Sequence, residues 1–385
     1  MPHGQDTYDV AVIGSGPAGA TTARHAAEQG LRVLLIDKKQ ELGSPIQCSG
    51  AVSANALNEA NIPLSDEYIS TPVYGFVTYN ARGESVTLDY RAYRDTPLGY
   101  VVDRRRFDRF LMTLAERAGV TVWLKCEATG YTPDPDRKTV TLQLQRFGLD
   151  STVQTRVIVG ADGVQSQVGK WAGLRTHIRL NELASCLQFV VDGVETNGLL
   201  EIVAGQEWAP GGYAWLFPKG HGYAEVGLGV ARTMTDHDAR WHLDHFMRNS
   251  FMAERLKDAR ILEVQGGGVP LAAPLRQPYA DYVLLVGDAA RHVNPITGGG
   301  IHMALRDGVM AGAVLAEVLA SDAPATEARL EPYHTRWMAE LGTAMWSLYD
   351  VKTSIFREKE RDVQDERLFT TLAGYFHPNS EYRKV

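Results

Sequence analysis

A glycine-rich turn between an apolar run and a small-residue helix constrains this chain most. Residues 8–13 (YDVAVI) are apolar and rich in β-branched side chains, and GSGPAG follows directly at 14–19. The next residues are Ala-rich and end at Gly30, the position of a helix C-cap, before a second apolar run at 31–37 that closes on Asp37. This order predicts a strand–helix–strand unit of about thirty residues.

The three glycines of this turn have different expected roles in dinucleotide binding. Gly14 allows the tight turn, Gly16 lets the main chain approach a pyrophosphate, and Gly19 lets the helix pack closely on the strand. The free N–H groups at the helix start then face the phosphates, and Asp37 is placed to accept hydrogen bonds from a ribose. Such glycines also occur in ordinary turns, but the flanking strand, helix and acidic residue favour dinucleotide binding.

Two further Gly/Asp signatures favour FAD over NAD as the dinucleotide. GADG at 160–163 follows a strand expected over 152–159, and GDAA and NPITGGGI occupy 287–301, within and after a buried strand expected over 282–290. A simple dehydrogenase does not need them. Asp288, at a strand end, is placed to bond a ribityl hydroxyl, and the glycines that open the following helix expose N–H groups suited to the anionic edge of a reduced flavin.

Composition and charge exclude several classes of protein. The chain has 385 residues, 44% of them hydrophobic, and a net charge of −7, which argues against a phosphate-backbone binder, so no nucleic-acid partner is expected. Three widely spaced cysteines predict neither a disulfide framework nor a zinc site, and no metal is expected. With no signal-peptide pattern and no apolar run of about 18 residues, we expect a cytoplasmic protein that is at most peripheral to a membrane.

The pattern along the chain predicts an α/β fold with a β-rich insert. Alternation at 71–99 is typical of antiparallel strands, 103–119 has helical periodicity, and 176–269 is again β-rich. A small-residue helix is expected over 301–320, followed by a helical tail. The expected domains are a discontinuous Rossmann-like FAD-binding domain (1–70, 100–175 and 270–325), an antiparallel β-sheet substrate domain (71–99 and 176–269) and a helical C-terminal region (326–385).

The three signatures together resemble the flavoproteins of the aromatic hydroxylase type over nearly the whole chain. Within that group the chain is most similar to the geranylgeranyl reductase family, which saturates isoprenoid double bonds in archaeal lipids, chlorophyll precursors and quinone tails. SPIQC, which places Cys48 after the second strand, and YAWLFP at 213–218, which matches the family motif YxWxFP, carry this likeness. Many archaeal members read Cys-Gly/Ala-Glu-Gly where this chain reads CSGAVS, so the substrate headgroup stays open.

The resemblance implies a set of site residues. Besides the glycines of the first turn, it implies that FAD contacts Ala18, Asp37, Cys48, Ser49, Ala51, Arg104, Ala128, Asp162, Asp288, Gly299, Gly300 and Ile301. It implies that Tyr213, Trp215 and Phe217 form the wall of a prenyl-chain cavity. Saturating an alkene also needs an acid near the flavin, and our hypothesis is that Cys48 donates this proton or positions its donor.

These residues also have plainer interpretations. Cys48 can be a small packed hydrophobic residue, and the alternating aromatic residues of 213–217 can be ordinary core. His292 and His302 flank the glycine loop without a metal-binding spacing.

Two other functions fit the same scaffold. One is a flavin monooxygenase or halogenase, although YAWLFP differs from the WxWxIP associated with halogenases. The other is a non-catalytic prenyl-binding carrier, which the Asp288 and GGG signatures argue against. Because no second strand–GxGxxG–helix unit is present, the electrons are expected to come from NAD(P)H docking near the flavin or from a small electron-carrier protein, and the substrate from a prenylated lipid at a membrane surface.

Overall fold

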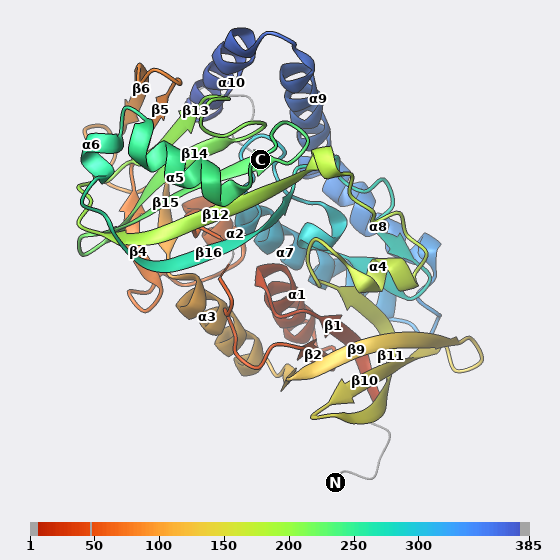
Figure 1. Cartoon of the computed structure of the whole chain (residues 1–385). Helices are drawn as coiled ribbons and strands as arrows, with labels where there is room; N and C mark the ends of the chain where they lie inside the picture. Colours follow the sequence, from red (N-terminus) through yellow and green to blue (C-terminus); the bar gives the residue numbers. More distant parts are fainter. Residues whose placement is uncertain (1–6, 47, 378–385) are drawn as a thin grey trace.

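The computed structural model describes residues 7–46 and 48–377 and contains two large β-sheets with helices packed around them (Figure 1). The mixed α/β fold predicted from the sequence is confirmed.

The first sheet has eight strands and contains the predicted strand–helix–strand unit. Its main path runs in the order β17-β18-β11-β1-β2-β8, parallel except at β17, and the antiparallel strands β9 and β10 extend it from β11. The elements are β1 (Thr7–Ile13), β2 (Val33–Asp37), β8 (Thr121–Leu124), β9 (Cys126–Asp134), β10 (Thr139–Arg146), β11 (Leu149–Gly160), β17 (Tyr279–Ala280) and β18 (Val283–Leu285). The apolar runs are buried because a parallel sheet is covered on both faces.

Small residues let two helices pack tightly beside this sheet. Helix α1 (Pro17–Glu28) lies against α7 (Ile301–Leu319). A Cβ on Gly308 of α7 would lie 2.5 Å from the Cβ of Thr21, and one on Gly312 would lie 2.6 Å from that of His25. Larger side chains on α7 would therefore push the two helices apart.

The second sheet has seven strands in the order β16-β12-β15-β14-β13-β5-β6. Its strands are β5 (Gly75–Tyr79), β6 (Ser85–Asp89), β12 (Leu183–Asp192), β13 (Leu200–Ala204), β14 (Tyr213–Gly220), β15 (Tyr223–Ala231) and β16 (Arg260–Pro270). Helices α5 (Ala239–Asn249) and α6 (Ala253–Leu256) belong to the hydrophobic cluster of one face, in which Phe189, Leu216, Val226 and Phe246 are buried. The opposite face of this sheet points toward the interior of the molecule.

A small third sheet joins the two large ones. It has the order β3-β7-β4, from Ala51–Ser53, Gly99–Val102 and Ile69–Val73. Helix α2 (Ala54–Glu59) follows β3, and α3 (Arg104–Arg117) follows β7.

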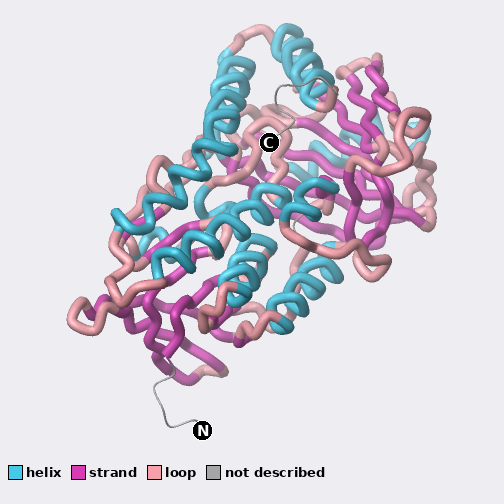
Figure 2. Tube along the Cα trace, turned by 180° about the vertical axis from the view of Figure 1, so that it is seen from behind, coloured by secondary structure: helices cyan, strands magenta, loops and turns pink. Residues whose placement is uncertain are grey.

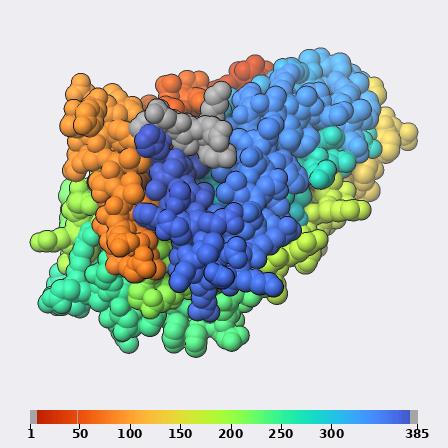
Figure 3. Space-filling view, turned by 90° about the horizontal axis from the view of Figure 1, so that it is seen from above, coloured from red at the N-terminus to blue at the C-terminus, as the bar shows by residue number. Residues whose placement is uncertain are grey.

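The C-terminal helices contact both large sheets, one helix through β5 and β13 and another through β17. They are α8 (Glu327–Trp337), α9 (Thr343–Arg357) and α10 (Arg361–Tyr375), and Figure 2 shows them as a row of helices seen from behind. Figure 3 shows α10, in dark blue, against the orange segment that carries β5 and β6. At this contact the ring of Phe376 stacks on that of Phe76 with centroids 4.0 Å apart.

The structure differs from the sequence-based expectations at four places. Residues 71–99 divide between two sheets, and β5 pairs parallel with β13 instead of only with its neighbours in sequence. The segment 176–269, expected to be β-rich, also contains the helices α5 and α6. Strand β9 forms where the sequence predicts no strand. The strand expected over 282–290 ends at Leu285, because Gly287 has a φ of +60° and the chain turns into a 3-10 helix. Every helix that the structure describes is too short or too polar to cross a bilayer.

Candidate functional site

The glycines of the first turn make different contacts. Gly14 has a φ of +106°, and a Cβ there would lie 2.2 Å from the main-chain oxygen of Ala161. A Cβ on Gly19 would lie 1.9 Å from the oxygen of Gly14, so α1 can approach the turn only if this residue lacks a side chain. A Cβ on Gly16 would have no atom within 4 Å, so this residue faces open space at the start of α1.

Asp37 is held by this turn at the end of β2. Its carboxylate accepts hydrogen bonds from the Ser15 N–H (2.8 Å), the Ser15 hydroxyl (2.5 Å) and the Lys39 N–H (2.8 Å). The side chain is buried, with 7% of the residue exposed. Asp37 therefore also fixes the turn that precedes α1, a role beyond the ribose contact predicted for it.

Asp162 and Asp288 follow neighbouring strands, β11 and β18. Asp162 accepts from the N–H groups of Gln167 (2.6 Å) and Val168 (3.0 Å), while its other oxygen, Oδ1, is buried without a partner among the described residues. The half-buried Asp288 carboxylate accepts no hydrogen bond from any residue that the structure describes. Burial raises the pKa of Asp288 to about 6, as expected for a carboxylate that lacks donors.

The glycine loop opens α7 beside Asp288. A Cβ on Gly300 would lie 3.4 Å from Asp288 Oδ1, and α7 begins with no side-chain cap, which leaves main-chain N–H groups for a ligand. The loop is held from inside by Asn294, whose side-chain oxygen accepts from the N–H groups of Ile296 and Thr297. Burial lowers the pKa of His302, in the first turn of α7, to about 4, so its imidazole is neutral at physiological pH.

Cys48 lies in the loop before β3, between the two large sheets. The Gly50 N–H donates to its sulfur over 3.4 Å. Arg104, the first residue of α3, forms a buried ion pair with Asp108 (3.0 Å). Burial lowers the pKa of Arg104, but the Asp108 carboxylate and the adjacent Cys48 sulfur more than compensate and raise it. A fixed positive charge therefore lies beside the Cys48 thiol.

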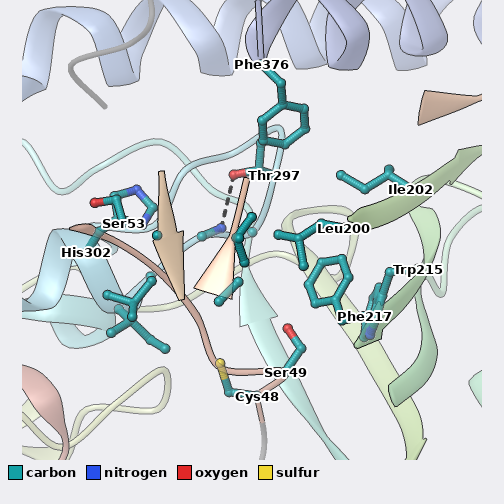
Figure 4. A pocket seen from close by; sticks show the side chains of 18 of the residues that line it. Cys48, Ser49, Ser53, Leu200, Ile202, Trp215, Phe217, Thr297, His302 and Phe376 are labelled. Atoms are coloured by element: carbon teal, nitrogen blue, oxygen red, sulfur yellow. Dashed lines mark hydrogen bonds between the residues drawn. The ribbon is translucent and has the colours of Figure 1, made fainter. Parts of the chain in front are cut away.

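A cavity of about 1170 Å³ lies between this loop, the glycine loop and the inner face of the seven-stranded sheet. Figure 4 shows Cys48 and Ser49 at one end, Trp215 and Phe217 on the sheet, and Phe376 reaching in from α10. Leu200 and Ile202 extend the apolar wall. The cavity is open near α2 and Thr96, where Leu64 lines it and is 58% exposed.

The aromatic residues of β14 form one side of this cavity. Tyr213, Trp215 and Phe217 alternate along the strand, with ring centroids 5.8 Å and 6.3 Å apart in sequence order. The Tyr213 hydroxyl donates to the main-chain oxygen of Thr297 in the glycine loop. Burial raises the pKa of Tyr213 well above its ordinary value, so the hydroxyl stays protonated.

The predicted site residues fall into two groups. Those that line the cavity are Cys48, Ser49, Ala51, Tyr213, Trp215, Phe217, Gly299, Gly300 and Ile301. The others lie outside it. Just after strands of the eight-stranded sheet are Gly14, Asp162 and Asp288, with Asp37 as the last residue of β2; Gly16, Ala18 and Gly19 are at the start of α1, Arg104 is at the start of α3, and Ala128 is within β9. The ends of parallel strands are where doubly wound sheets bind dinucleotides.

Some histidines and cysteines have structural roles. His292 is fully buried, with Nδ1 2.7 Å from Asp307 Oδ2 and its ring stacked on Trp337 at 3.7 Å. No group of three His, Cys, Asp or Glu side chains that could hold a metal occurs among the described residues. Cys126 is buried in β9.

Sequence reasoning missed several residues of the cavity wall. They are Phe76, Cys186, Gln188, Gln265, Lys352 and Phe376, together with His302, which was considered only as a metal ligand. Burial raises the pKa of Cys186 to about 12, and the nearby Cys48 adds to this. One signal was available: polar or small residues alternate with larger apolar ones in CLQFV at 186–190, as in a strand with one polar face.

Space and donors along this edge fit FAD. Gly16 faces open space at the helix start, α1 has no side-chain cap, and Asp288 is a half-buried carboxylate without a donor. The uncapped start of α7 offers N–H groups next to the cavity. These features provide donors for a pyrophosphate and a flavin edge, and an acceptor for a ribityl hydroxyl.

Two family models match the chain. The geranylgeranyl reductase catalytic domain matches residues 182–269, and an FAD binding domain matches residues 7–197 and 232–341.

Curated relatives cover nearly the whole chain. A digeranylgeranylglycerophospholipid reductase from Methanosarcina acetivorans is 34% identical over 98% of this chain and 95% of its own length. One from Methanocaldococcus jannaschii is 36% identical over 86% of this chain and 82% of its own.

Solved structures agree with this likeness. A geranylgeranyl bacteriochlorophyll reductase-like protein from Thermoplasma acidophilum has a TM-score of 0.88 and 30% identity, covering 98% of both chains. A p-nitrophenol 4-monooxygenase from Pseudomonas putida has a TM-score of 0.74 at 17% identity, covering 98% of this chain and 96% of its own. The second likeness shows only that the aromatic-hydroxylase fold is shared.

Proposed function

Because the chain belongs to the geranylgeranyl reductase family of FAD-dependent oxidoreductases, we propose that it saturates the double bonds of geranylgeranyl chains attached to a glycerophospholipid. The chain is an FAD-dependent reductase of prenyl carbon–carbon double bonds; the glycerophospholipid is the finer part of the proposal and rests on the names of its relatives. The observation that carries it is the large apolar cavity that joins the glycine loop of α7 to the aromatic strand β14.

The residues that would hold FAD begin at the strand ends of the eight-stranded sheet and continue into the lining of the cavity. The glycines of the first turn and the start of α1 would hold the pyrophosphate, Asp37 the adenosine ribose, and Asp288 the ribityl chain. The glycine loop and the segment of Cys48 to Ala51 would hold the ring. When bound there and reduced, FAD would supply the hydride that one carbon of the alkene needs.

The chain's own residues shape the site and handle the proton. The aromatic wall of β14 excludes water and holds the prenyl chain, which must lie within about 3–3.5 Å of the reacting atom. Cys48 holds a proton at Sγ and donates it to the second carbon of the alkene. Its neighbour Arg104 cannot act as the acid, since its guanidinium remains charged beside Asp108.

The electron source and the route of the substrate complete the proposal. The electrons come from NAD(P)H docking near the flavin or from a small electron-carrier protein. The substrate enters from a membrane surface at the opening near α2. The protein works in the cytoplasm and associates peripherally with that surface. The division into a discontinuous FAD-binding domain, a β-rich substrate domain and a helical C-terminal region stays a prediction, with the boundaries given in the sequence analysis.

Mass spectrometry tests this function directly. The purified holoenzyme, reduced by dithionite, is incubated with digeranylgeranylglycerophospholipid in detergent, and we expect mass gains in steps of two hydrogens. Consumption of O₂ with an oxygenated product would instead indicate a monooxygenase, and a colourless protein that binds the lipid unchanged would indicate a carrier.

A further inference from the structure

A row of side chains with polar groups crosses the wall that the seven-stranded sheet gives the cavity. Gln265 on β16 lies opposite Gln188 on β12, and Gln188 lies opposite Gly227 on β15. Gly227 in turn lies opposite Trp215 on β14. Residues directly opposite each other point to the same face of a sheet, and the two glutamines and the tryptophan all line the cavity.

Gly227 brings these side chains together. A Cβ at this position would lie 2.6 Å from the Cβ of Gln188 and 2.6 Å from Cε2 of Trp215. The indole therefore lies across β15, over the glycine, and reaches the strand that carries Gln188. The indole N–H and the carboxamides of the glutamines share one stretch of the wall.

The hydrogen bonding of this row is incomplete. Gln188 and Gln265 are 3% and 4% exposed, and the Gln188 amide donates to Gln265 Oε1 over 2.5 Å. Gln188 Oε1 and the buried Trp215 Nε1 have no partner among the described residues. Whichever way the two carboxamides are turned, a bonded pair leaves one NH₂ group and one oxygen unused. Since buried polar groups are nearly always hydrogen-bonded, the row is suited to a polar atom of a ligand.

A prenyl substrate offers one such atom, and this step rests on the proposed function. A geranylgeranyl chain is hydrocarbon except for the oxygen at C1, which joins it to a glycerol or a phosphate. That oxygen accepts hydrogen bonds, while the indole N–H and the unused NH₂ group donate them. We propose that the Gln188–Gln265 pair and the Trp215 indole bind the C1 oxygen of the prenyl chain and so determine which double bond is reduced first.

The inference explains how a chain of repeating units is placed in register. The double bonds recur every five carbons in nearly identical surroundings, so apolar contacts alone hold the chain almost equally well in several positions. A hydrogen bond to the single oxygen distinguishes these positions, because a site built to bond a heteroatom discriminates far more strongly than an apolar pocket does.

The test follows the order of reduction. Dithionite-reduced holoenzyme is given digeranylgeranylglycerophospholipid for a limited number of turnovers, and the saturated positions are located by tandem mass spectrometry and NMR. We expect a fixed order in the wild type and a mixture of positions in the double variant Gln188→Leu/Gln265→Leu and in Trp215→Phe. Gln143→Leu, the same change on β10 of the other sheet, keeps the wild-type order.

A second substrate distinguishes a loss of register of the prenyl chain from a failure of the variants to fold. A C20 tetraene that lacks the C1 oxygen is expected to lose its reduction order in the wild type, with no further change in the variants; this comparison stands even if the double variant fails to fold. The inference is overturned if the variants keep the wild-type order, if the wild type has no order, or if the variants weaken FAD binding or shift the flavin spectrum while the order persists. If the wild type reduces no prenyl double bond at all, the proposed function fails instead.

Discussion

The hydroxyl of Tyr213 on β14 donates a hydrogen bond to the main-chain oxygen of Thr297, in the loop that opens α7. The bond joins the inner face of the seven-stranded sheet to the glycine loop beside which the flavin ring is expected. Tyr213, the first residue of the family motif, therefore holds the glycine loop as well as lining the cavity.

Removing this bond should loosen FAD. For Tyr213→Phe we expect a loss of about 1 kcal/mol in the free energy of unfolding and a several-fold faster dissociation of FAD, followed by the recovery of free flavin fluorescence. Tyr79→Phe is the matched control, because its hydroxyl bonds Glu201 (3.1 Å), away from the glycine loop. Equal FAD dissociation in the two variants would contradict the link.

The role of Cys48 predicts a selective loss of turnover. Cys48→Ala should bind FAD and be reduced by dithionite as the wild type is, while alkene saturation falls by about 10²-fold or more, the usual contribution of a general acid. Cys126→Ala, which removes a buried thiol from β9, should keep turnover. Undiminished saturation by Cys48→Ala would show that the proton comes from elsewhere.

Gly16 and Gly19, at the start of α1, should differ in how much the same added methyl group destabilises the fold. Gly19→Ala places a carbon 1.9 Å from the oxygen of Gly14, and we expect it to destabilise the fold by about 3 kcal/mol or more. Gly16→Ala meets no atom within 4 Å and should change the free energy of unfolding by less than about 1 kcal/mol.

The FAD affinity of Gly16→Ala gives the decisive measurement. Its methyl group points into the space expected for the pyrophosphate, so the dissociation constant for FAD, measured by titration of the apoprotein, should rise at least about tenfold. Wild-type affinity in a well-folded Gly16→Ala protein would place the pyrophosphate elsewhere.

Glu225 should make the stability of the protein depend on pH. Burial raises its pKa from 4.5 to about 7, although its partner Lys219, 3.1 Å away, opposes the shift. The folded state therefore holds this proton more tightly than the unfolded state. The corresponding stability is fully present below pH 4.5 and is lost as the pH rises through 7, by about 3 kcal/mol.

Urea unfolding at pH 5 and pH 8 measures this contribution. The decrease between the two pH values should be smaller in Glu225→Gln than in the wild type, whereas Glu254→Gln, which removes an exposed partner of Lys257, should keep the wild-type difference. The same decrease in Glu225→Gln and the wild type would show that another group is responsible.

The features that were predictable from the sequence are those encoded by residues close together in the chain. The turn at Gly14 to Gly19 joins β1 to α1, and the apolar patterns of β1, α1 and β2 are complete within about thirty residues. The structure has each of these elements. The family resemblance then extended the fold to the whole chain.

The features that were missed depend on pairing between distant segments. Gln188 and Gln265 are in contact only because β12 and β16 are neighbours in the sheet, and no local pattern specifies that neighbour. The same holds for Phe376, which reaches the cavity by stacking on Phe76 from the end of α10. The end of the strand at Leu285 was missed because apolar residues continue past the point where Gly287 turns the main chain.

The parallel pairing of β5 with β13 has consequences for folding during synthesis and for the design of chimeras with relatives. During synthesis β5 leaves the ribosome long before β13, and until then only β6 can pair with it, in a two-stranded ribbon of marginal stability. A chimera that exchanges only residues 176–269 with a relative would take β13 from one parent and β5 from the other. The native pairs from Leu200↔Phe76 to Val203↔Tyr79 would then form a seam between residues of two different parents. Exchanging residues 75–89 together with that segment keeps both sides of the seam from one parent.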